Sequence, residues 1–251
     1  MIRLRLAWRL ARVFLHLLVG LAACAFVFPW ARRGLRDGIT RRWSRRLLGI
    51  CGVRVEQAPG FPVLEHVLFV SNHISWLDIF VINSLYPCRF VAKAEIRAWP
   101  VLGWLVAAAG TVFIARGNRR ELRHIFKGIV SVLALGERVA FFPEGTVAHQ
   151  GQVLPFHANL FEAAIDAGVA VQPCALSYLD EQGAWHPNVD YVGEITFVDS
   201  ILTILRGGPI RARLQPLAPI DAVGAHRREL AQAAHDAVAS ALGSGTPVRP
   251  A

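Results

Sequence analysis

The residues best suited by type and spacing to do chemistry are His73 and Asp78, five positions apart. The apolar run 67–70 has the composition of a buried strand, and a polar turn leads from it into a helical stretch. In open α/β sheets, sites form where strands end and helices begin. A histidine there can take a proton from an alcohol while a carboxylate fixes its tautomer. Alternatively, Asp78 only interacts with the helix N-terminus, and His73 is a surface turn residue.

Two other chemistries are less favoured at this segment. Ser75 could act as a nucleophile, but it lies in no Gly-x-Ser-x-Gly elbow, which favours direct transfer without a covalent intermediate. A metal held by His66, His73 and Asp78 lacks convincing further ligands at helical or hairpin spacing. We therefore expect no metal site.

Two further apolar segments end in polar residues that could meet the same substrate. The segment 110–117 contains Arg116, whose guanidinium fork suits a phosphate or a carboxylate. The segment 139–146 ends in a Pro-Glu-Gly-Thr turn, where Gly145 lets a ligand approach the backbone and Glu144 could orient a hydroxyl. Either segment alone could be an ordinary strand-to-loop transition.

The elements that must position these residues follow from the apolar pattern after residue 57. Short apolar runs alternate with longer helical stretches, which predicts an α/β fold with a mostly parallel sheet flanked by helices. The expected strands are 67–70, 89–92, 111–114, 139–142, 169–175 and 210–215. The expected helices are 77–85, 100–109, 119–135, 158–167 and 227–242.

Residues 1–56 differ from the rest of the chain in charge and hydropathy. They hold twelve arginines, no lysine and two acidic residues, whereas the remaining 195 residues are nearly neutral. The apolar run 13–30 is about one bilayer span long and has arginines on both sides, so it fits a helix that spans or one that dips into a leaflet. The segment 38–51 fits a basic amphipathic helix. We therefore predict a membrane-docking two-helix motif in residues 1–56, followed by a catalytic domain in residues 57–251.

The same distribution argues against other classes of protein. The net charge of +9 is concentrated in the N-terminal segment, whereas a nucleic-acid groove would more often spread charge and aromatic residues over the folded body. The box 21–24 (LAAC) resembles a lipoprotein cleavage site, but the apolar run continues past it and a charged segment follows, which disfavours a cleaved signal. The four scattered cysteines fit free thiols in a reducing compartment.

Together and in this order, the segments resemble the glycerolipid acyltransferase family, typified by bacterial 1-acyl-glycerol-3-phosphate acyltransferase. The family pattern comprises Asn-His-x4-Asp, a lysine-bearing stretch, Gly-x-x-Phe-Ile-x-Arg, Phe-Pro-Glu-Gly-Thr and a Val-x-Pro strand. The resemblance covers about residues 66–220. The matching positions are Asn72, His73, Asp78, Lys93, Gly110, Phe113, Ile114, Arg116, residues 142–146, Val171 and Pro173.

The resemblance implies an enzyme that moves an acyl group from acyl-CoA or acyl carrier protein to a lyso-lipid hydroxyl, with no cofactor. His73 would be the general base and Asp78 its orienting partner. The implied location is the cytoplasmic face of the inner membrane, with membrane lipids as partners and no nucleic acid. The implied acceptor-binding residues are Lys93, Arg116, Glu144, Gly145 and Thr146.

One departure from the family pattern bears on the acceptor. Val147 stands where lysophosphatidate enzymes usually carry an arginine after the Phe-Pro-Glu-Gly-Thr block, which removes a bidentate phosphate partner. The stretch 153–161 also resembles branches that include lyso-ornithine-lipid acyltransferases. We expect 1-acyl-sn-glycerol-3-phosphate as the acceptor, with another lyso-lipid such as lyso-ornithine lipid as the alternative. A lipid or thioester hydrolase and a non-enzymatic membrane-docking protein are the rivals from other classes.

Overall fold

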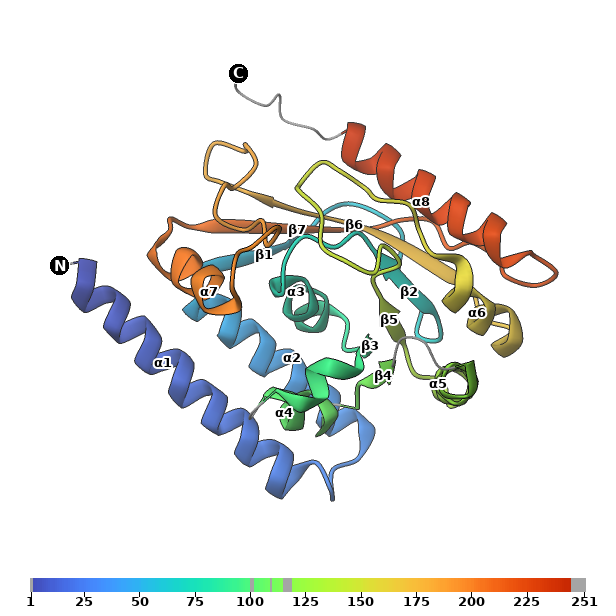
Figure 1. Cartoon of the computed structure of the whole chain (residues 1–251), viewed down its shortest axis with the longest axis horizontal. Helices are drawn as coiled ribbons and strands as arrows, with labels where there is room; N and C mark the ends of the chain where they lie inside the picture. Colours follow the sequence, from blue (N-terminus) through green and yellow to red (C-terminus); the bar gives the residue numbers. More distant parts are fainter. Residues whose placement is uncertain (1, 100–101, 109, 115–118, 245–251) are drawn as a thin grey trace.

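Seven strands form one sheet in this computed structural model, which describes residues 2–99, 102–108, 110–114 and 119–244 (Figure 1). The strand order is β1-β7-β6-β2-β5-β3-β4, and every neighbouring pair is parallel except β6 and β7. The predicted mostly parallel sheet is confirmed. The strands are β1 (Val53–Gln57), β2 (Leu68–Ser71), β3 (Arg89–Lys93), β4 (Val112–Ile114), β5 (Val139–Phe141), β6 (Val171–Leu179) and β7 (Ile210–Pro216).

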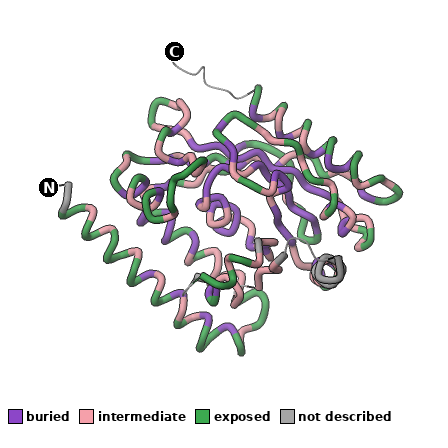
Figure 2. The backbone as a smooth tube through the Cα atoms, in the orientation of Figure 1, coloured by how far each residue is buried: buried purple, intermediate pink, exposed green. Residues whose placement is uncertain are grey.

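Helices cover both faces of this sheet, as parallel strands require. On β2, Phe69 packs with α2, α3 and α7, whereas Leu68 and Val70 pack on the opposite face with α5, α6 and α8. Figure 2 shows the central strands buried between these layers. The helices are α1 (Ile2–Ala22), α2 (Arg33–Ile50), α3 (Leu77–Leu85), α4 (Leu102–Ala108), α5 (Arg119–Ala134), α6 (Glu162–Ala167), α7 (Phe197–Arg206) and α8 (Arg227–Ser244).

Shorter helical turns adjoin several of these helices. The predicted helix 158–167 is divided into a 3₁₀ turn followed by α6. Helix α4 lies within the predicted helix 100–109, whose residues 100, 101 and 109 are outside the described part of the structure. The turns are η1 (Ala23–Val27, a π-helix), η2 (Ala94–Ala98) and η3 (Ala158–Phe161).

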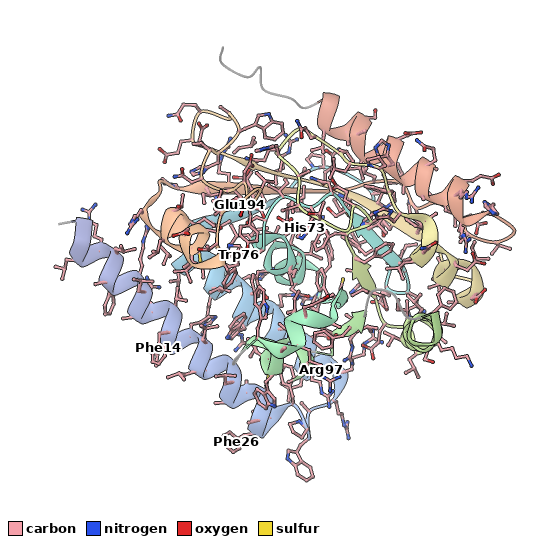
Figure 3. All side chains as sticks on the ribbon, in the orientation of Figure 1. Phe14, Phe26, His73, Trp76, Arg97 and Glu194 are labelled. Carbon is pink, nitrogen blue, oxygen red and sulfur yellow. The ribbon has the colours of Figure 1, made fainter. Side chains whose placement is uncertain are left out.

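The N-terminal helix is longer than the apolar run predicts. It begins at Ile2, because arginine is a good helix former and the basic residues before Val13 continue the helix. One stretch, Leu4–Val27, is long and apolar enough to cross a membrane by length and composition. Its side chains are mostly exposed: Phe14 and Phe26 point away from the rest of the molecule (Figure 3).

Helices α1 and α2 are fixed to each other and to the domain by polar contacts. His16 and Trp43 stack with ring centroids 4.6 Å apart, and each side chain bonds to the other's backbone carbonyl. Arg9 donates to the Leu205 carbonyl on α7 at 2.7 Å, and Arg45 donates from α2 to a carbonyl of α3. The two helices therefore hold a defined orientation relative to the sheet.

Two elements were not expected from the sequence. Strand β1 pairs with β7 at one edge of the sheet, so the sheet begins at Val53 and the N-terminal helices end at Ile50. Helix α7 begins after Thr196, whose hydroxyl oxygen accepts from the Asp199 backbone N–H. This Thr-x-x-Asp spacing is a helix-start signal.

Candidate active site

The His73–Asp78 pair lies at the carboxyl end of β2, in the loop that leads into α3. The Nδ1 atom of His73 is 2.7 Å from Oδ2 of Asp78. The carboxylate favours the tautomer with a proton on Nδ1, which leaves Nε2 free to accept a proton. The His73 side chain is 19% exposed and that of Asp78 is fully buried. The pair thus presents a reachable base with a protected partner.

Asp78 is held by three further donors. The backbone N–H groups of Ile74 and Ser75 donate to Oδ2 at 2.7 and 3.0 Å, and the Tyr178 hydroxyl donates to Oδ1 at 2.6 Å. Burial and the neighbouring carboxylate raise the pKa of Tyr178 well above its ordinary value, so the phenol stays a donor. Because both carboxylate oxygens are satisfied inside the protein, Asp78 cannot swing away from His73.

Glu144 links the turn after β5 to the His73 backbone. Its Oε1 accepts from the His73 N–H at 2.8 Å, and its Oε2 accepts from the Leu154 N–H at 2.9 Å. The side chain is buried, and burial raises the pKa of this carboxyl above its ordinary value despite the two bonds. Glu144 therefore ties the loop that carries His73 to the turn after β5. Its predicted contact with the acceptor stays a prediction.

Two neighbours orient the His73 ring and its loop. The Phe142 ring stacks on the imidazole with centroids 4.0 Å apart and an interplanar angle of 8°. The Asn72 carboxamide exchanges two hydrogen bonds with the Leu176 backbone, at 2.8 and 2.9 Å, and so joins the end of β2 to β6. Ser75, considered above as a nucleophile, is fully buried between these elements and cannot reach a substrate.

The Phe-Pro-Glu-Gly-Thr segment forms a tight turn beside this pair. Gly145 has a φ of 69°, a conformation that glycine adopts without steric cost, and its N–H donates to the Phe142 carbonyl at 3.1 Å. Thr146 is exposed. The next segment is tied to the loop that carries His73, because the Ala148 N–H donates to the His73 carbonyl at 2.8 Å. Hydrogen bonds from Glu144 and Ala148 therefore tie this turn to the His73 backbone, and the predicted binding roles of Gly145 and Thr146 stay predictions.

The two predicted basic residues are placed less completely. The backbone of Lys93 ends β3, two strands away from β2 in the sheet, but its side chain lies outside the described part of the structure. Arg116 lies outside the described residues altogether. Val147 is half-buried and offers no polar group at the position after the turn. The predicted binding roles of Lys93 and Arg116 stay predictions.

An apolar cavity of about 480 Å³ lies between the N-terminal helices and the catalytic domain. Trp76, three residues after His73, forms part of its wall and packs edge-to-face on Phe80 and Phe197. This volume lies within the range of known ligand pockets, roughly 300–1,000 Å³. The residues that line the cavity thus come from α1, from α2 and from the segment that begins α3. Its apolar lining includes Val13, Leu17, Trp43, Phe80, Leu105 and Ile201.

Comparison with known proteins decides which chemistry this geometry serves. Residues 52–177 match the Acyltransferase family. The chain is 38% identical to the lyso-ornithine lipid O-acyltransferase of Pseudomonas aeruginosa. The match covers 99% of this chain and 98% of that protein. The chain belongs to the acyltransferase family. This match confirms the resemblance seen in the sequence, and the protein is an O-acyltransferase.

Other relatives of this acyltransferase carry a different acceptor in their names. The 1-acyl-sn-glycerol-3-phosphate acyltransferase of Neisseria meningitidis is 48% identical, over 49% of this chain and 50% of that protein. The crystal structure of the 1-acyl-sn-glycerophosphate acyltransferase from Thermotoga maritima matches with a TM-score of 0.68 at 21% identity, covering 97% of this chain and all of that one. The structural match shows a shared fold.

Proposed function

We propose that this acyltransferase moves a fatty acyl group from an acyl thioester, on coenzyme A or acyl carrier protein, to the hydroxyl of a lyso-lipid. The observation that carries the proposal is the His73–Asp78 pair, because its bond at Nδ1 leaves Nε2 available to deprotonate an alcohol. The adjoining apolar cavity suits an acyl chain.

The reaction needs only groups that this chain and its substrates supply. His73 removes the proton of the acceptor hydroxyl at Nε2 while the oxygen attacks the thioester carbonyl carbon. A carbon–oxygen bond forms, the carbon–sulfur bond breaks, and the thiolate leaves with the proton that His73 accepted. Asp78 stabilises the transient imidazolium and holds the ring in place. The stacked Phe142 keeps the ring plane fixed through both proton transfers.

Lyso-ornithine lipid is the acceptor we place first. The relative that matches nearly the whole chain carries that name, as do relatives from Rhizobium meliloti and Brucella abortus at 34% and 32% identity. Val147 supports the same choice, because it leaves the turn without the guanidinium that a phosphate would favour.

1-Acyl-sn-glycerol-3-phosphate is the second candidate. The highest local identity among the relatives above belongs to a protein with this acceptor in its name, although that match covers only half of either chain. Lys93 and Arg116 would be its phosphate partners. The sequence resemblance favoured this acceptor. Experiment distinguishes it from lyso-ornithine lipid.

We also propose that the enzyme works at the cytoplasmic face of the inner membrane. The long apolar helix α1 can anchor it, and the arginines of residues 1–56 suit an anionic lipid surface. A membrane location would bring the lyso-lipid to the enzyme without exposing its acyl chain to water.

An acceptor panel tests the proposed function. Purified enzyme in mixed micelles is given radiolabelled acyl-CoA or acyl carrier protein, together with either lyso-lipid or with no acceptor. We expect labelled diacyl product from one of the two acceptors, and a loss of at least about 10³-fold in His73→Ala. Release of free fatty acid at the same rate without any acceptor would identify a hydrolase instead.

A further inference from the structure

His157 lies directly against the turn that follows β5. A Cβ atom added to Gly145 would lie 3.3 Å from Cδ2 of His157 and 3.7 Å from its Nε2. The Cδ2–Nε2 edge of the imidazole therefore faces the Glu144–Gly145–Thr146 turn. A glycine at this position gives the ring room to approach the backbone of the turn closely.

The backbone holds His157 in this place. Its N–H donates to the Pro143 carbonyl at 2.9 Å, on one side of Glu144, and the Leu154 N–H donates to Glu144 itself. The other oxygen of Glu144 binds the His73 N–H. A single side chain thus connects the segment that carries His157 with the backbone of His73.

The His157 ring is free to bind a ligand. Its side chain is exposed, and among the described residues no hydrogen bond or ion pair occupies either ring nitrogen. The two other histidines of this region are occupied: His73 by Asp78, and His149 by Asp190 at 2.9 Å. An imidazole always has at least one N–H to donate and can also carry a positive charge.

Resting on the proposed function, we propose that His157 binds the anionic group of the acceptor headgroup. Both candidate acceptors carry an oxyanion, a phosphate in one and the ornithine carboxylate in the other. Val147 leaves the turn without a cationic side chain, and the adjacent face of the same turn presents His157 instead. The oxyanion would be held by the Nε2 edge while the acceptor hydroxyl lies at His73.

A second histidine provides a matched control. His66 is also exposed and packs over a glycine of positive φ, since a Cβ on Gly136 would lie 2.8 Å from its Nε2. However, His66 precedes β2 and Gly136 precedes β5, whereas His73 and Gly145 follow those strands. Because β2 and β5 are parallel, the control lies at the opposite end of the sheet.

The test compares full-length wild type, His157→Ala, His157→Lys and His66→Ala with each lyso-lipid acceptor. We expect His157→Ala to raise the acceptor KM about 10-fold to 100-fold, the effect of losing a charged hydrogen bond, with kcat and the donor KM unchanged. His157→Lys should restore the acceptor KM to within about threefold, since it keeps a cationic donor. His66→Ala should behave as wild type.

Three outcomes would overturn the assignment: an unchanged acceptor KM in His157→Ala, no rescue by lysine, or equal losses in His157→Ala and His66→Ala. Melting temperatures identify a merely structural role, in which the loss of activity would follow a loss of stability. The acceptor with the larger His157→Ala effect identifies the oxyanion as phosphate or carboxylate. Failure of the wild type with both acceptors would refute the proposed function, whereas normal wild-type transfer with an unaffected His157→Ala would refute only this inference.

Discussion

Four hydrogen-bond donors converge on the carboxylate of Asp78, and they come from two parts of the chain. His73, Ile74 and Ser75 belong to the catalytic loop itself, whereas Tyr178 reaches in from the end of β6. The carboxylate is therefore fixed before any substrate binds. Such preorganisation is what an orienting partner needs in order to act on the transition state rather than on substrate binding.

Tyr178→Phe tests this arrangement. Removing the hydroxyl leaves Oδ1 of Asp78 buried without its donor, so the carboxylate loosens around His73. We expect kcat to fall about tenfold with both KM values unchanged. A hydrogen bond to a charged group is worth about 1.5–3 kcal/mol, and only part of this free energy contributes to stabilising the transition state. Asp78→Asn should cost far more, about 10³-fold or greater, because the amide favours the wrong tautomer. A Tyr178→Phe enzyme as impaired as Asp78→Asn would contradict this division of roles.

His186 makes stability depend on pH near the active-site loops. It is buried, its Nδ1 accepts from the Asn188 N–H, and its carbonyl accepts from Gln150. Burial lowers the pKa of His186 below its usual value of 6.5. The unfolded chain therefore takes up this proton first as the pH falls, and the stability present above pH 6.5 is lost progressively below it.

His186→Asn removes this titration and keeps an acceptor near Nδ1. We expect the melting temperature of the wild type to fall more steeply between pH 7.5 and pH 5.5 than that of His186→Asn. Thermal unfolding of both proteins, in one detergent and at a series of pH values, measures this difference. Parallel curves for the two proteins would show that His186 does not titrate differently on folding.

At this scale the sequence predicted the contact between His73 and Asp78 but not the residues that support it. His73 and Asp78 are close in sequence and lie at a strand end, so their contact follows from local geometry. Tyr178 is 100 positions from Asp78 and lies on a strand that reads as ordinary core. Only the pairing of β6 with β2 brings it there, and a single sequence contains no local signal of that pairing.

At the scale of the elements, long apolar runs were predicted well and short edge elements were not. Each predicted strand was found within about two residues at its start, because buried parallel strands are continuous apolar runs. Strand β1 has charged residues on its open face, as edge strands often do, and so lacks that signal. The beginning of α1 was missed for a similar reason, since its arginines interrupt the apolar run.

The cavity between the helical elements predicts a control of acyl-chain length. Cys24 lies in η1 and lines the cavity beside Leu105 and Phe28. Cys24→Phe would fill part of the space, and each methylene excluded from an apolar site costs about 0.8 kcal/mol. We expect kcat/KM for a 16-carbon donor to fall about tenfold or more relative to an 8-carbon donor.

The control for this change is Leu15→Phe. Leu15 is 62% exposed on α1, so the larger ring meets no cavity and donor preference should stay as in the wild type. The melting temperatures of both variants show whether Cys24→Phe only fills the cavity or also destabilises the fold. Overpacking of a core can lower the free energy of unfolding by about 1–3 kcal/mol. Equal losses for both donors in a stable Cys24→Phe enzyme would place the acyl chain elsewhere.

For the whole molecule, charge and exposed apolar surface are segregated to the same end of the chain. The arginines of residues 1–56 account for the net positive charge, and the same segment carries eleven of the nineteen large exposed apolar side chains of the described structure, seven of them on α1. Anionic lipid headgroups would attract the arginines, and the acyl layer of the membrane would bury the exposed apolar side chains. Neither feature contributes to the core of the sheet, so membrane binding and folding can be changed separately.

A double substitution on α1 tests this separation. Phe14→Asp with Leu18→Asp places two charges on exposed positions, which should abolish binding to vesicles containing anionic lipid without lowering the melting temperature. Leu135→Asp, at another exposed apolar position, is the control and should bind as the wild type does. With lyso-lipid presented in vesicles, kcat/KM should fall at least about tenfold in the double variant, whereas a water-soluble short-chain acceptor should be acylated at the wild-type rate. Loss of activity with both kinds of acceptor would show that α1 shapes the site itself rather than bringing the enzyme to its substrate.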